Sequence, residues 1–154
     1  MRHWLFKTEP SEFSWERLVR EGRTVWSGVR GFQARNNMME MKVGDLGFFY
    51  HSSIATPAVV GIVKVIREAH PDPTAWDKSS DYYDPRSTEK KPMWFMVEVA
   101  PEGDLPREVT LAEMRAEPRL AYMALLRKGQ RLSVQPVSPQ EWETILTMAR
   151  AAPV

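Results

Sequence analysis

Short apolar segments of strand type recur along almost the whole chain, and this recurrence limits the fold more than any other feature of the sequence. Alternation and β-branched content predict strands at 3–8, 45–51, 59–66, 93–99 and 132–137, and a short strand or an extended approach at 24–26. Helix signals fall between and after them. The mixture predicts an α+β fold, a curved mixed β-barrel of about five to six strands with flanking helices.

Three helix starts are marked by hydroxyl residues that can accept a hydrogen bond from a free backbone N–H: Ser14, Thr110 and Ser138. The second and third have a glutamate three positions later, the spacing of a capping box, and Pro139 suits the first helical position. Gly22 is a plausible stop for the first helix. The apolar stripe of the last helix predicts that it docks on the core.

The segment 70–92 carries four prolines and little periodicity, which predicts a surface loop longer than most. Loops of that length often have a functional role.

Length and composition indicate a single globular domain over 1–154, since 154 residues with 43% hydrophobic and 27% charged residues can bury a core. No apolar run has the length of a signal peptide or a membrane span, so we expect a cytoplasmic protein without a membrane partner. The net charge of +1 argues against binding duplex DNA mainly through phosphates. Any nucleic-acid binding must then come from a pocket with a local basic patch.

Metal and cofactor sites have no support in the sequence. The chain has no cysteine, and its three histidines, His3, His51 and His70, are isolated from one another. No glycine-rich phosphate loop or nucleophile elbow is present. We therefore expect no metal and no cofactor.

The segment 26–41 is the most unusual part of the chain. It combines Trp26 and Gly28 with the adjacent amides Asn36 and Asn37 on a predicted helix. Amides can match the donor and acceptor edge of a base, and a tryptophan can stack on the base face. The alternatives are that Trp26 is a core residue and that the asparagines occupy a frayed helix end. Local phosphate contacts would fall to Arg30, Arg35 and Lys42.

Seven motifs in order resemble the EVE domain, a family of the PUA-like superfamily related to YTH domains, and the resemblance runs from about Trp4 to Trp142. They are Trp4-Leu-Phe-Lys-Thr-Glu-Pro10, Val25-Trp-Ser-Gly-Val-Arg30, Gln33-Ala-Arg-Asn-Asn37, Lys42-Val-Gly-Asp-Leu46, Phe49-Tyr-His-Ser52, Val60-Gly-Ile-Val63 and Leu132-Ser-Val-Gln-Pro136.

The resemblance implies a PUA-like barrel with a cleft that recognises a modified base in single-stranded or flipped-out DNA or RNA. Carried over by motif, the binding residues would be Lys7, Thr8, Trp26, Ser27, Gly28, Asn36, Asn37, His51, Ser52, Ser133, Val134 and Gln135. EVE domains are often fused to nucleases or other effectors. This chain shows no fused domain, which leaves two alternatives: a separate effector protein as a partner, or a stand-alone role.

A second reading is a small hydrolase of a modified nucleoside, because PUA-like relatives of the ASCH type include such enzymes. Lys7, Thr8 and Glu9 would supply an amine, a hydroxyl and a carboxylate. On a strand Lys7 and Glu9 point to the opposite face from Thr8, which weighs against a working triad. A protein–protein adaptor is the third class. We favour a non-catalytic base-binding module.

Overall fold

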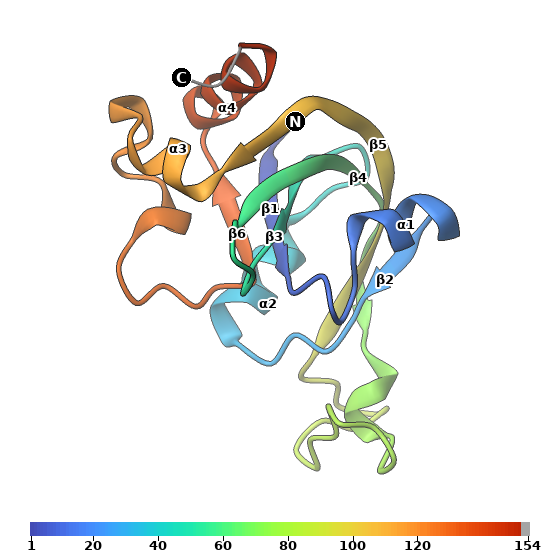
Figure 1. Ribbon diagram of the computed structural model, residues 1–154. Helices are drawn as coiled ribbons and strands as arrows, with labels where there is room; N and C mark the ends of the chain where they lie inside the picture. Colours follow the sequence, from blue (N-terminus) through green and yellow to red (C-terminus); the bar gives the residue numbers. More distant parts are fainter. Residues whose placement is uncertain (152–154) are drawn as a thin grey trace.

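The computed structural model describes residues 1–151, in which six strands form one mixed sheet (Figure 1). The strands are β1 (His3–Thr8), β2 (Thr24–Trp26), β3 (Leu46–His51), β4 (Ala58–Pro71), β5 (Phe95–Thr110) and β6 (Val134–Val137). Their order is β2-β5-β4-β3-β1-β6. β1 and β3 are parallel, and the other neighbours are antiparallel. The domain expected over 1–154 includes residues 152–154, which lie outside the described part.

The sheet is strongly curved because its two longest strands are irregularly paired. The register between β4 and β5 shifts at four points, and β3 and β4 shift once. Each bulge bends its strand and increases the local twist. The result is a half-barrel in which β2 and β6 form the two open edges. The predicted curved, mixed α+β fold is confirmed.

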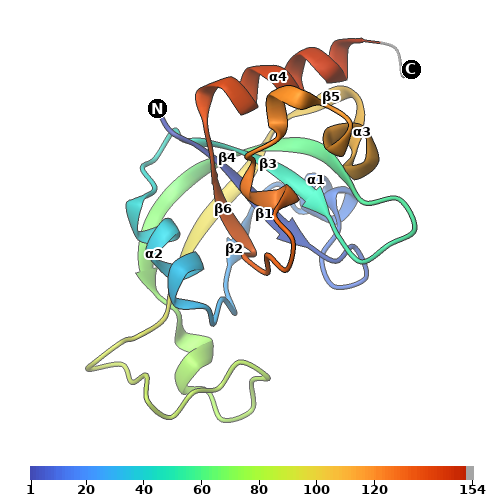
Figure 2. The same cartoon turned by 90° about the vertical axis from the view of Figure 1, so that its left-hand side faces the viewer.

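Helices cover the margins of this half-barrel (Figures 1 and 2). They are α1 (Trp15–Glu21), α2 (Phe32–Glu40), α3 (Leu111–Arg115) and α4 (Pro139–Arg150), with 3-10 turns η1 (Pro73–Trp76), η2 (Pro118–Leu120) and η3 (Ala124–Leu126). All three predicted N-caps are confirmed, since Ser14, Thr110 and Ser138 each accept a hydrogen bond from the expected backbone amide. Gly22 ends α1 in the left-handed region, at φ 82°. No helix within 1–151 is long and apolar enough to cross a membrane.

Both faces of β1 are buried, so its alternating side chains enter two separate cores. Trp4 and Phe6 pack inside the curved sheet with the residues of α1 and α2. Leu5 faces the other way and packs with Phe48 and with Trp142 of α4. The docking of the last helix, expected from its apolar stripe, is confirmed.

The strands β4 and β5 extend well beyond their apolar patterns. The predicted strand 59–66 continues to Pro71, and the predicted strand 93–99 continues as β5 to Thr110. Backbone pairing between two long strands needs no apolar side chains, so periodicity marks only their core-facing parts. The segment between them, from Pro73 to Trp94, projects from one end of the half-barrel (Figure 2).

Candidate functional site

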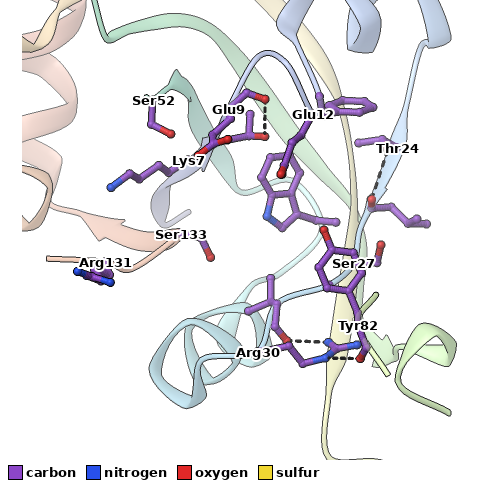
Figure 3. Close-up of a pocket in the computed structure, with 16 residues that line it drawn as sticks. Lys7, Glu9, Glu12, Thr24, Ser27, Arg30, Ser52, Tyr82, Arg131 and Ser133 are labelled. Carbon is purple, nitrogen blue, oxygen red and sulfur yellow. Dashed lines mark hydrogen bonds between the residues drawn. The ribbon is translucent and has the colours of Figure 1, made fainter. Parts of the chain in front are cut away.

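A cavity of about 440 Å³ lies between the two open edges of the half-barrel (Figure 3). It is bounded by the end of β1 and the turn after it, by β2 and the loop after it, by the projecting segment, and by the approach to β6. Its lining residues are Lys7, Thr8, Glu9, Glu12, Phe13, Thr24, Val25, Trp26, Ser27, Gly28, Val29, Arg30, Ser52, Tyr82, Arg131 and Ser133. The half-barrel therefore brings segments that are distant in sequence together around one cavity.

Trp26 forms the inner wall of this cavity, but it is mainly a core residue. Its side chain is 9% exposed and belongs to the core inside the sheet. Its ring meets Phe6 and Phe49 edge to face, with centroid distances of 5.2 and 5.9 Å. A ligand could reach only a small part of its surface.

Tyr82, from the projecting segment, covers the backbone of Gly28. Gly28 has φ +79°, a conformation that favours glycine, and a Cβ at this position would lie 2.8 Å from the Tyr82 ring. Absence of a side chain at Gly28 therefore allows the ring to lie against the cavity wall. Tyr82 remains 44% exposed, which leaves aromatic surface available to a ligand. The sequence reading noted the long loop, but no local pattern distinguished Tyr82.

A buried carboxylate joins the loop after β2 to the projecting segment. Asp72 Oδ2 accepts hydrogen bonds from the Gly28 amide (2.8 Å) and from Arg30 Nη1 (3.2 Å), while Oδ1 accepts from the Thr74 amide (2.9 Å) and hydroxyl (2.6 Å). Burial by itself raises the pKa of Asp72, but the hydrogen bonds from Thr74, Gly28 and Arg30 outweigh it and hold the pKa below its ordinary value.

Arg30 is occupied by this connection. Besides Asp72 it donates to the Tyr82 carbonyl (2.9 Å), the Val29 carbonyl (2.8 Å) and the Thr74 hydroxyl (3.0 Å). Its guanidinium also lies over the Tyr82 ring. These contacts of Arg30 hold the Tyr82 segment in place. They leave the guanidinium few N–H donors for a phosphate.

The cavity presents several polar side chains that make no hydrogen bond or ion pair to other residues within 1–151. They include Lys7, Glu9, Glu12, Ser27, Arg131 and Ser133. Figure 3 shows Lys7 reaching toward the side of the cavity that holds Arg131 and Ser133. The cavity is therefore lined by cationic, anionic and hydroxyl side chains together with the aromatic rings of Trp26 and Tyr82.

Most of the expected binding residues lie around this cavity, and five do not line it. The residues that line it are Lys7, Thr8, Trp26, Ser27, Gly28, Ser52 and Ser133. The five that lie elsewhere are Asn36, Asn37, His51, Val134 and Gln135.

Of the five residues outside the cavity, four are buried or hydrogen-bonded within the fold, and Asn36 is exposed elsewhere on the surface. Asn37 is buried and donates to the Val134 carbonyl (2.8 Å), which ties α2 to β6. His51 Nε2 accepts the amide of Trp15 (3.0 Å), and burial lowers its pKa. Val134 and Gln135 are buried in the sheet. Asn36 is exposed.

The other two expected phosphate contacts also lie outside the cavity. Arg35 donates to the Met93 carbonyl (3.0 Å) and to Asn36 Oδ1 (2.9 Å). Lys42 is exposed and lies 4.0 Å from a carboxylate oxygen of Glu68. The cations available at the cavity are Lys7 and Arg131 instead.

The geometry does not assemble a catalytic triad from Lys7, Thr8 and Glu9. The Thr8 hydroxyl donates to the Glu9 carbonyl at 3.4 Å, and Lys7 makes no hydrogen bond to it. No group of three potential metal-ligating side chains occurs within 1–151.

A half-barrel of this topology with a cavity between its edges defines a PUA-like domain, and comparisons with known proteins give its family. The EVE domain family model matches residues 2–148. Human thymocyte nuclear protein 1 is 36% identical over 170 aligned positions, which cover 98% of this chain and 75% of that protein. The chain belongs to the EVE domain family.

Solved structures agree with this assignment. Human thymocyte nuclear protein 1 in complex with DNA containing 5-methylcytosine superposes with a TM-score of 0.94 at 36% identity, covering 99% of this chain and 100% of that one. A protein from Pseudomonas putida superposes with a TM-score of 0.92 at 44% identity, covering 96% and 99%. An ASCH protein from Zymomonas mobilis, at 11% identity and a TM-score of 0.58 over 96% and 99%, shares the fold alone.

Proposed function

We propose that this domain binds DNA by holding one modified base, of the 5-methylcytosine type, in the cavity between β2 and β6. The observation that carries the proposal is a cavity that combines aromatic surface with unpartnered polar groups. Its volume of about 440 Å³ falls in the range of sites that enclose one small ligand. The related human domain, whose structure contains 5-methylcytosine DNA, supports the choice of ligand.

Stacking and edge contacts would supply the affinity. Tyr82 offers the exposed aromatic face, because Trp26 is almost wholly covered by core residues. Glu9 and Glu12 offer carboxylates, which accept hydrogen bonds from the exocyclic amine of a cytosine. Stacking on Tyr82 and hydrogen bonding to the base edge both require an unpaired base. The base would therefore be in a single strand or flipped out of a duplex.

The proposed role is non-catalytic. The hydrolase alternative would need an activated nucleophile, and Thr8 makes its hydrogen bond to the Glu9 carbonyl, not to a base. Incubation with modified nucleosides tests this directly, and release of a new product would contradict the binding role.

Recognition of RNA, a separate effector protein and a cytoplasmic location remain predictions from the sequence. DNA binding requires only that the protein reach DNA, which lies in the nucleus or, in a cell without one, in the cytoplasm.

Replacing Tyr82 with alanine is expected to weaken binding about 5- to 150-fold, because stacking on an aromatic side chain contributes ~1–3 kcal/mol per base. The measurement is fluorescence anisotropy with a short single strand that contains one 5-methylcytosine. Tyr83→Ala is the matched control, since Tyr83 is a comparably exposed neighbour outside the cavity. Equal losses in both variants, or none in Tyr82→Ala, would contradict the stacking role.

Binding is expected to depend only weakly on salt. Few cations remain free near the cavity, namely Lys7 and Arg131 with the neighbouring Arg127 and Lys128. About four phosphate contacts on a single strand correspond to a log–log slope between about −2 and −4. Titrations at several salt concentrations measure this slope, and a value near −8 would indicate an extended backbone groove instead of a pocket.

A further inference from the structure

A second and larger hollow lies on the other side of the segment that leads into β6. Its volume is about 810 Å³, and Gln33, Tyr122, Arg127, Gln130 and Leu132 are among its lining residues. Together with the first cavity it occupies the region around β6, one hollow to either side of the residues that precede that strand.

The two hollows share one thin wall. In the segment 130–133, Arg131 and Ser133 line the first cavity, while Gln130 and Leu132 line the second. Because neighbouring residues of one extended segment separate the hollows, a strand with a base in the first cavity would pass over this wall to the second.

Tyr122 gives the second hollow an aromatic surface. It is 88% exposed, in the turn between η2 and η3, and is the most exposed aromatic side chain within 1–151. Its flat face can stack on any base.

Positive charge in and just before the shared wall fits a phosphate backbone. Arg131 lies in the wall and Arg127 and Lys128 precede it, all three exposed and without an ion pair to residues of 1–151. The acidic residue of the second hollow, Glu141, is occupied as the cap of α4, where it accepts the Ser138 amide at 2.9 Å. The wall and the residues just before it therefore present positive charge where the connecting phosphates would cross.

We propose that the second hollow binds a nucleotide that neighbours the modified base on the same strand, with Tyr122 stacked on its base and Arg127 against its phosphate. This inference rests on the proposed function of the first cavity. The favoured occupant is a nucleotide, not a peptide, because the exposed Tyr122 and Arg127 line a hollow that only the segment 130–133 separates from the base cavity.

The test compares two single-stranded DNA probes that each contain a central 5-methylcytosine. One has ordinary flanking nucleotides, and the other has abasic flanks that keep the sugars and phosphates. The wild-type protein should bind the first probe about 5- to 150-fold more tightly, the factor expected from one stacked base. In Tyr122→Ala this difference should disappear while affinity for the abasic probe stays unchanged.

Arg127→Gln should weaken binding of both probes and reduce the salt slope by about 0.7, because the phosphates are present in each. Tyr83→Ala and Arg20→Gln are the matched controls, at exposed positions outside both hollows. Tyr122→Ala should fold normally, since its side chain is almost fully exposed. Thermal melting of each variant checks this.

The outcomes separate the two proposals. Equal wild-type affinity for both probes, or a Tyr122→Ala variant that keeps the difference, overturns the second site. If Tyr82→Ala still loses affinity in that case, the first cavity stands. A wild-type protein that binds neither probe, or whose binding does not depend on Tyr82, overturns the proposed function and the second site with it.

Discussion

Replacing Trp26 with alanine is expected to lower the free energy of unfolding by about 3–5 kcal/mol, the cost of truncating a large aromatic residue in a packed core. The indole is 9% exposed and packs on Phe6 and Phe49 inside the curved sheet. Its removal would leave a cavity that β1 and β3 cannot close, because their paired backbones fix the neighbouring rings. Urea denaturation followed by circular dichroism measures the change.

Two further variants show whether this loss comes from core packing. Trp26→Phe should lose much less stability, since it keeps an aromatic ring against the same neighbours. Tyr122→Ala should change stability by no more than about 0.5 kcal/mol, because its side chain is on the surface. A Trp26→Ala protein that melts like wild type but no longer binds DNA would make Trp26 the stacking platform and contradict its role in the core.

Replacing Asp72 with alanine is expected to cost about 3 kcal/mol of stability, the lower end of the range for breaking a buried ion pair. The carboxylate is fully buried, whereas Arg30 is 22% exposed, so water partly compensates the arginine that is left behind. The Gly28 amide would also lose its acceptor. Because these contacts hold the Tyr82 segment, the variant should bind DNA more weakly as well. Chemical denaturation and anisotropy measure the two effects.

The contribution of Asp72 should also depend on pH. Its pKa is lowered in the folded protein, so the stability it supplies is complete above the unfolded value near 4 and is lost as the pH falls through the lower folded value. Asp72→Asn keeps the shape of the side chain but cannot ionise. The difference in stability between wild type and Asp72→Asn should therefore be constant above about pH 5 and shrink in more acidic solution. A difference that stays constant down to pH 2 would contradict the lowered pKa.

The motifs named residues that meet at one cavity and residues that do not. Lys7, Trp26 and Ser133 line the same cavity although they lie on three different segments. His51 and Gln135, also named through the motifs, lie outside it.

Asn36 and Asn37 were named both through a motif and because amides suit base edges. A helical pattern does not tell which way the helix is rotated against the sheet, and the rotation of α2 buries Asn37 and leaves Asn36 in solvent.

The rotation of α2 against the sheet also decides which of its apolar residues are buried. The apolar Phe32 and Met39 are both about half exposed, while Met38 is fully buried. The helix has almost no amphipathic pattern. Ala34 and Met38 pack into the core, and Asn37 donates to the Val134 carbonyl of β6.

Local chemistry along the chain determined approximately where most strands and helices begin and which helices are capped. Caps and periodicity involve residues a few positions apart, so they can be read without knowing the fold. Tertiary structure alone decided that Asp72 binds the Gly28 amide across 44 positions, that Tyr82 covers Gly28, and that Arg30 is held by both. These contacts depend on how far β4 and β5 continue past the core, and backbone pairing between distant strands leaves no periodic pattern in the side chains.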